Sequence, residues 1–192
     1  MQPVKEALMK TVLVLNSSPR AGGNSETLSD SLIKGVQDAG SVGVKINLRE
    51  LNILPCKGCF GCQTGHGDPC VQKDDMARVY DAVREADVVV FATPVYWHQM
   101  NGIMKNAVDR LFAMMKSLDD KHRETAMIAS AASEDPVVFD GLEANYKAIA
   151  GMLKWDVRGV IRAGGLNLPT DKAMNKYKNQ ALTLGRMLCQ TY

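Results

Sequence analysis

The sequence is poor in the features that mark several large classes of protein. It has no apolar run near the ~20 residues of a membrane-spanning helix, and its start, MQPVKEALMK, lacks the apolar segment of a secretory signal. Its charges nearly balance, with 23 Lys and Arg against 21 Asp and Glu, which favours neither nucleic acid nor an acidic membrane surface as a partner. Aromatic residues are only 6%, but 46% hydrophobic and 23% charged residues exclude wholesale disorder. We therefore expect a soluble, cytoplasmic, globular protein.

The sequence does contain a regular alternation of short apolar strands and amphipathic helices. Five strands are predicted, over residues 10–16, 44–51, 86–95, 124–132 and 155–163. Such alternation predicts an α/β protein with a single doubly wound, five-stranded parallel sheet in the flavodoxin-like order 2-1-3-4-5. We expect residues 10–192 to form this one domain, after an N-terminal extension of residues 1–9. Ligands of such sheets bind beyond the carboxyl ends of the strands, where the order reverses.

The loop after the first strand reads NSSPRAGGNSET, residues 16–27, and leads into a helix. Short polar side chains, a guanidinium and the free N–H groups of a helix N-terminus together favour a phosphate. The loop has neither the Gly-Lys-Ser/Thr of a Walker A motif nor a GxGxxG turn. The alternative is an ordinary turn with a Ser or Asn helix cap. The candidate phosphate ligands are Ser17, Ser18, Arg20, Asn24, Ser25 and Thr27.

The loop after the third strand reads TPVYWHQMN, residues 93–101. Two aromatic side chains at a ligand-facing sheet edge favour contact with a flat ring system, whose heteroatoms can bond to backbone N–H groups. The alternative is that Tyr96 and Trp97 close the rim of the sheet or a subunit interface.

Together, SSPRAGGNS and TPVYW make residues 10–163 resemble the NADPH-dependent FMN reductase family. The resemblance implies an FMN-binding domain, NAD(P)H as co-substrate, and a homodimer or homotetramer. It implies that the first loop holds the FMN phosphate, and that Pro94, Val95, Tyr96 and Trp97 border the isoalloxazine ring with Asn101 nearby. The loop from Ser130 to Glu134, after the fourth strand, is then expected on the other side of the ring.

Four of the five cysteines, Cys56, Cys59, Cys62 and Cys70, have the spacing C-x2-C-x2-C-x7-C. The first three match the start of a ferredoxin motif, whereas the fourth lies further on and is not followed by Pro. The full spacing resembles the compact motif of iron–sulfur flavoproteins, which bind FMN and a 4Fe–4S cluster. A cluster, a zinc ion and structural or redox-active thiols stay open as alternatives.

The predicted function is an FMN-dependent NAD(P)H oxidoreductase that passes electrons to a small acceptor such as a quinone or a flavin. The alternative is an iron–sulfur flavoprotein that acts as an electron-transfer protein, and a flavin-free α/β binding module is a third class. We expect no catalytic side chain in the strict sense, because the flavin would carry the chemistry.

Overall fold

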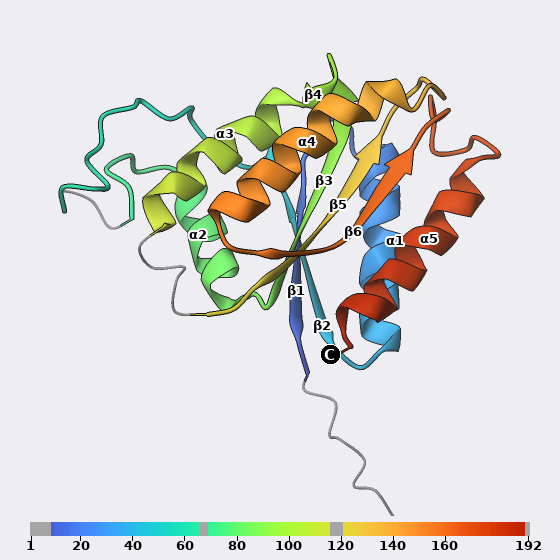
Figure 1. Ribbon diagram of the computed structural model, residues 1–192, viewed down its shortest axis with the longest axis horizontal. Helices are drawn as coiled ribbons and strands as arrows, with labels where there is room; N and C mark the ends of the chain where they lie inside the picture. The colour runs from blue at the N-terminus through green and yellow to red at the C-terminus, as the bar shows by residue number, and fades with distance from the viewer. Residues whose placement is uncertain (1–8, 66–68, 116–120, 191–192) are drawn as a thin grey trace, which may run out of the picture.

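The computed structural model of the chain describes residues 9–65, 69–115 and 121–190. A twisted parallel sheet runs through its centre in the order β2-β1-β3-β5-β6, and a short strand, β4, pairs antiparallel with the end of β3 (Figure 1). This order confirms the predicted flavodoxin-like fold. The strands are β1 (Thr11–Asn16), β2 (Val42–Asn47), β3 (Val88–Tyr96), β4 (Gln99–Met100), β5 (Glu124–Ser130) and β6 (Asp156–Ala163).

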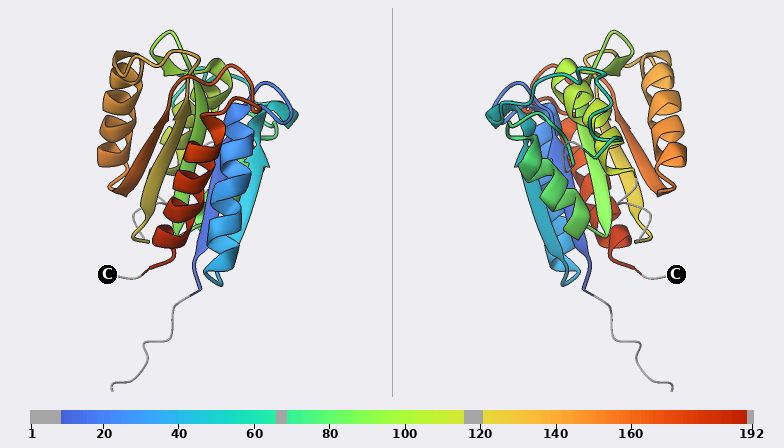
Figure 2. Two further views of the ribbon diagram at one scale, coloured as in Figure 1. Left: turned by 90° about the vertical axis from the view of Figure 1, so that its right-hand side faces the viewer. Right: turned by 90° about the vertical axis from the view of Figure 1, so that its left-hand side faces the viewer.

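Helices cover both faces of the sheet, as the apolar character of its central strands requires. Helices α1 and α5 lie side by side on one face, and α2, α3 and α4 cover the other (Figures 1 and 2). Each face has its own cluster of buried side chains. No helix in the described ranges is long and apolar enough to cross a bilayer. The helices are α1 (Asn24–Asp38), α2 (Met76–Glu85), α3 (Gly102–Arg110), α4 (Val137–Met152) and α5 (Met174–Leu188).

The second strand and the third helix are shorter than predicted. The strand predicted over residues 44–51 ends at Asn47, because its neighbour β1 ends opposite it at Asn16 and leaves no further pairing partner. Residues Leu48–Glu50 form a 3₁₀ turn instead, which buries Leu48. The helix predicted over residues 101–116 becomes a 3₁₀ turn at Leu111–Met114, and residues 116–120 lie outside the described ranges.

Two glycines set the close approach of α1 to α5. A Cβ atom on Gly35 would lie 2.1 Å from the carbonyl oxygen of Leu182, and one on Gly185 would lie 2.2 Å from that of Leu32. Both obstacles are backbone atoms of the facing helix. The two helices therefore pack backbone to backbone, which no residue with a side chain permits without displacement of one helix.

We predict that Gly185→Ala destabilises the fold although alanine has the higher helix propensity. The clash should lower the free energy of unfolding by about 1–3 kcal/mol, the usual cost of overpacking. Gly151→Ala in α4 is the matched control, because a Cβ there meets nothing within 4 Å. Urea unfolding of both variants tests the prediction, and equal stabilities would contradict it.

Candidate functional site

The loops after β1 and β3 meet at the carboxyl edge of the sheet, where a buried hydrogen-bond network joins them. The N–H of Ser17 donates to the carbonyl of Ala92 at 2.9 Å. Asn101 Nδ2 donates to the carbonyl of Ser17 at 2.7 Å, and the N–H of Asn101 donates to Thr93 Oγ1 at 3.3 Å. Asn101 Oδ1 also caps α3 by accepting from the N–H of Met104 at 3.1 Å. The two loops are therefore held as one unit.

A cavity of about 300 Å³ opens at this junction. Its walls come from the phosphate loop (residues 17–23) and the start of α1, from the end of β3, and from the segments that follow β5 and β6. The lining residues are Ser18, Pro19, Arg20, Asn24, Ser25, Pro94, Val95, Tyr96, Ser130, Ala131, Ala132, Leu166 and Asn167. Eight of these are among the sequence-predicted cofactor ligands, and they come from three separate strand ends.

The phosphate-loop end of the cavity is suited to an anionic, hydroxyl-bearing ligand. The helix α1 begins there after Gly23, with no side chain capping its N–H groups. A Cβ on Gly23 would lie 2.5 Å from Ser18 Oγ, so the loop folds tightly enough to present its backbone. Arg20 is exposed at the mouth. Asn24 donates to the carbonyl of Leu166 at 2.7 Å, while its buried Oδ1 has no partner and is free to accept a hydrogen bond. These features fit the phosphate and ribityl chain of FMN.

A buried carboxylate supports the phosphate loop from behind. Glu26, which is only 7% exposed, accepts from the N–H of Gly22 at 2.7 Å and pairs with Arg49 at 2.9 Å and Lys45 at 3.2 Å. Burial raises the pKa of Glu26, but the hydrogen bonds from Arg49, Gly22 and Lys45 lower it by more. The pKa of Glu26 is therefore below its ordinary value. The two cations cancel a charge that would otherwise repel a phosphate nearby. Sequence reasoning missed this residue, since its partners are distant in the chain.

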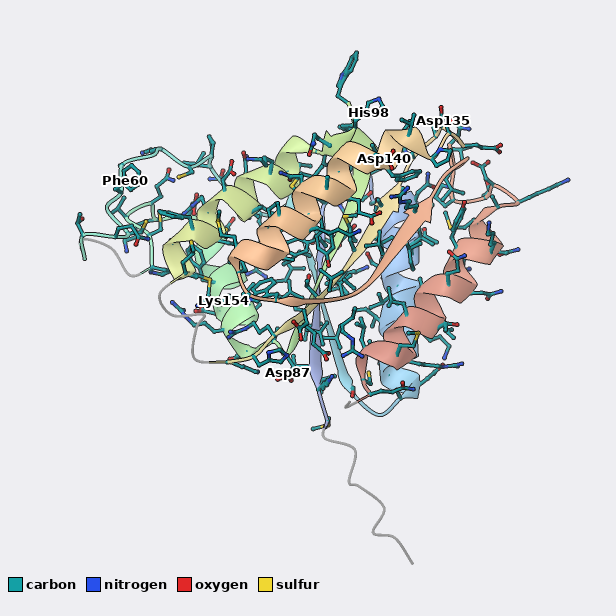
Figure 3. All side chains as sticks on the ribbon, viewed as in Figure 1. Phe60, Asp87, His98, Asp135, Asp140 and Lys154 are labelled. Atoms are coloured by element: carbon teal, nitrogen blue, oxygen red, sulfur yellow. The ribbon has the colours of Figure 1, made fainter. Side chains whose placement is uncertain are left out.

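The opposite wall is a hairpin whose tip turns through a rare conformation. Trp97 and His98 both have positive φ, 50° and 62°, between the paired residues Tyr96 and Gln99. That is the pattern of a type I′ turn, which usually takes Asn and Gly. His98 lies at the outer tip of the molecule (Figure 3). Trp97 is 96% exposed and is not among the residues that line the cavity.

Four predicted ligands lie outside the cavity lining. Ser17 and Asn101 belong to the buried network between the loops, and Thr27 Oγ1 donates to the carbonyl of Gly22 at 3.4 Å. Direct contact of these residues and Trp97 with FMN stays a prediction. Ser130 Oγ and Ser25 Oγ are hydrogen-bonded to each other at 2.8 Å across the cavity floor.

Two of the lining residues that sequence reasoning missed, Leu166 and Asn167, follow β6, whereas Ala131 and Ala132 belong to the loop already expected there. The signal that could have found Leu166 and Asn167 is the rule that every parallel strand ends at the same edge.

A second cavity, of about 440 Å³, lies under the cysteine loop (residues 52–65 and 69–75). This loop projects beyond α2 and α3, and Phe60 lies on it, far from His98 (Figures 1 and 3). All four clustered cysteines line the cavity, together with apolar side chains of α3, the following turn and α4. Cys56 and Cys59 are exposed, and Cys62 and Cys70 are half-buried. The fifth cysteine, Cys189, is buried at the end of α5.

The sulfurs are not arranged around one ion. In the described ranges, no three His, Cys, Asp or Glu side chains gather closely enough to hold a single metal ion. A preformed zinc centre, which needs four ligands about one atom, is therefore not present among these residues. An iron–sulfur cluster takes its thiolates from wider apart, because each binds a different iron atom. The four thiols that line the one cavity are the number of ligands that such a cluster takes.

An ion pair closes the base of the cysteine loop. Asp74 accepts from the N–H of Leu54 at 3.0 Å and pairs with Arg110, whose Nη1 also donates to the carbonyl of Leu54 at 3.3 Å. Burial raises the pKa of Asp74, but Arg110 and the N–H groups of Leu54 and Met76 lower it more. Burial also raises the pKa of the Cys70 thiol, while the N–H of Gln72 and the Arg110 guanidinium bring it below its usual value.

The model of the NADPH-dependent FMN reductase family matches residues 10–155. The chain belongs to this family. Membership confirms the resemblance predicted from the two loops. The family match includes both loops and the cysteine loop but ends before β6.

Among proteins similar in sequence to this FMN reductase family member is an iron-sulfur flavoprotein of Archaeoglobus fulgidus, 36% identical over 99 residues. The match covers 52% of this chain and 47% of the relative, so it spans about half of that relative's length.

The solved structures show the same fold at low identity. An azoreductase from Bacillus anthracis has a TM-score of 0.71 at 17% identity, with 93% of this chain and 100% of that chain covered. An NAD(P)H:quinone oxidoreductase from Methanothermobacter marburgensis has a TM-score of 0.69 at 16% identity, with 96% and 99% covered.

We predict that the Glu26 carboxylate stabilises the fold in a pH-dependent way. Glu26→Gln should lower the free energy of unfolding near pH 7 by about 1–3 kcal/mol, because two half-buried cations, Lys45 and Arg49, each lose one of their charged partners. The pKa of Glu26 is lowered on folding, so its contribution is complete above the unfolded value of 4.5 and is lost as the pH falls through the folded value. The gap between wild type and variant should therefore shrink in acid.

Denaturant unfolding of both proteins at several pH values between neutral and acid measures this gap. Asp30→Asn is the matched control, since Asp30 shares Lys45 with Glu26 but its side chain is 60% exposed. A gap that stays constant across the acid range would contradict the prediction.

Proposed function

We propose that the chain is an FMN-dependent oxidoreductase domain that takes electrons from NADH or NADPH and passes them to a small acceptor such as a quinone or a free flavin. The observation that carries the proposal is the cavity at the strand-order reversal, with an uncapped helix N-terminus, a guanidinium and an unpartnered amide oxygen at one end. Membership of the FMN reductase family supports it.

The residues of the cavity have separable tasks in this proposal. The uncapped N-terminus of α1 and the guanidinium of Arg20 bind the phosphate, and the buried Asn24 Oδ1 accepts a hydroxyl of the ribityl chain. Pro94, Val95 and Tyr96 border the ring on the hairpin side, while Ala131 and Ala132 lie across the cavity. Bound FMN supplies hydride acceptance and electron transfer, so the protein's work is to bind, orient and shield it.

A half-exposed Tyr96 and an open mouth leave one side of the cavity accessible to a second molecule. A pyridine nucleotide and an acceptor would use this opening in turn. A homodimer or homotetramer, in which another subunit covers part of the mouth, stays a prediction.

We predict that Arg20→Ala weakens FMN binding and leaves the fold intact. Arg20 is exposed and lines the cavity, so its removal should raise the Kd by about tenfold, the equivalent of one charge-assisted hydrogen bond at ~1.5 kcal/mol. Quenching of FMN fluorescence on titration with apoprotein measures the Kd. Arg186→Ala, which removes an exposed guanidinium on α5, is the control. Equal Kd values for the two variants would contradict a role for Arg20 in binding the FMN phosphate.

A specific observation favours a second function for the same chain, that of an iron–sulfur flavoprotein. All four cysteines of the C-x2-C-x2-C-x7-C motif line one cavity, which opens over α3 and the loop rather than at the flavin site. The similar protein from Archaeoglobus fulgidus carries that name. In this proposal Cys56, Cys59, Cys62 and Cys70 hold a 4Fe–4S cluster, and the domain transfers electrons between the cluster and FMN.

Iron and sulfide assays on anaerobically purified protein test the second function. About four iron and four sulfide per chain are expected in the wild type. Cys59→Ser should lose most of this iron, whereas Cys189→Ser should keep it, because Cys189 is buried on the opposite face of the sheet. A wild-type protein that contains flavin but no iron would support the reductase proposal and contradict the proposed cluster.

A further inference from the structure

The guanidinium of Arg110 is an unusual group to find at the base of the cysteine loop. Its side chain is 1% exposed and that of its partner, Asp74, is 3% exposed. Burial of an ion pair is costly unless the remaining donors and acceptors are also satisfied. Each N–H group of Arg110 is therefore expected to have a hydrogen-bond acceptor.

Among the described residues, Nη1 is the one guanidinium nitrogen of Arg110 with well-formed hydrogen bonds to acceptors. Nη1 pairs with Asp74 and donates to the carbonyl of Leu54, which is enough to close the loop. Nε and Nη2 are buried and make no well-formed hydrogen bond within the described residues, although the guanidinium lies close enough to Cys70 to lower the pKa of its thiol. Buried donors of a charged group without acceptors are rare in native proteins, and they call for an unseen ligand or ion.

The position of these donors indicates what the missing acceptor is. Arg110 lines the cavity that the four cysteines line, and its charge acts on the Cys70 thiol. Asp109, which also lines this cavity, is paired with Lys105, so it does not compete for Arg110. Sulfur bound by the four cysteines of this cavity is therefore the acceptor that we infer for Nε and Nη2 of Arg110.

We propose that Arg110 is a positioning residue for an anionic sulfur-rich group in the cysteine cavity, to whose sulfurs its Nε and Nη2 groups donate and whose reduction potential those hydrogen bonds raise. The inference rests on the proposed 4Fe–4S centre. Four thiolates and the cluster sulfides carry net negative charge, and reduction adds one electron and one further negative charge. Fixed N–H donors to the sulfurs therefore stabilise the reduced form more than the oxidised form, although the ion pair of Arg110 with Asp74 is neutral as a whole.

Asp74 has a different part in the same arrangement. It fixes the guanidinium through Nη1 and leaves Nε and Nη2 available on a residue that lines the cavity. It also accepts from the N–H groups of Leu54 and Met76, so the orientation of Arg110 is tied to both ends of the cysteine loop.

A redox titration of protein loaded anaerobically with ferrous iron and sulfide tests the proposal. Arg110→Met alone would bury an unpaired Asp74 and could fail to fold, so the main variant is the pair Asp74→Asn and Arg110→Met, which removes both charges together. Arg110→Lys keeps the charge but loses the planar fork. Arg162→Met, on β6 and paired with Glu143 and Asp140, is the control.

The double variant should have a lower midpoint potential, with the reduction equilibrium changed about tenfold, or ~59 mV for one electron. Arg110→Lys should show a smaller drop, and Arg162→Met none. An unchanged potential in a folded, fully iron-loaded double variant would show that Arg110 has only a structural role, while the proposed cluster would stand. A wild type that takes up no iron and sulfide would overturn both the cluster and this role for Arg110.

Discussion

The hydrogen bond from Asn101 Nδ2 to the carbonyl of Ser17 is the contact on which the flavin-side geometry depends. It joins the loop after β1 to the start of α3, across the point where the strand order reverses. The same Asn101 caps α3 through its Oδ1 and holds the end of β3 through Thr93. Because all of these groups are buried, each bond that is lost would leave a polar atom without water or a partner. The phosphate loop and the hairpin therefore keep one fixed separation.

The phosphate loop and the cysteine loop are each supported by a carboxylate that is buried against a guanidinium. Glu26 and Arg49 support the phosphate loop, and Asp74 and Arg110 support the cysteine loop. In both cases the carboxylate accepts a backbone N–H of the loop it supports, Gly22 in one and Leu54 in the other. The parallel explains how long irregular segments keep a defined shape on a rigid sheet.

The sequence was sufficient for the strand order and for most of the lining of the cavity beside β1 and β3, because both follow from apolar periodicity and from the common edge at which parallel strands end. It could not show which way side chains face. Ser17 and Asn101 are polar residues in the right loops, yet they join the loops to each other. The pairing of Glu26 with Arg49 depends on contacts between distant segments that no local pattern encodes. The turn at Trp97 and His98 could not be predicted for another reason, since a two-residue turn with positive φ at both positions usually has Asn and Gly there.

The backbone contact between α1 and α5 has a consequence for how the protein is made. The helix that presents its N-terminus to the phosphate is packed, at Gly35 and Leu32, against residues near the end of the chain. Asn24 is also held by Leu166, which follows the last strand. On a ribosome the first loop emerges long before these partners, and contacts of such large sequence separation form late. The nascent chain therefore reaches the folded form of this loop only after β6 and α5 have been synthesised.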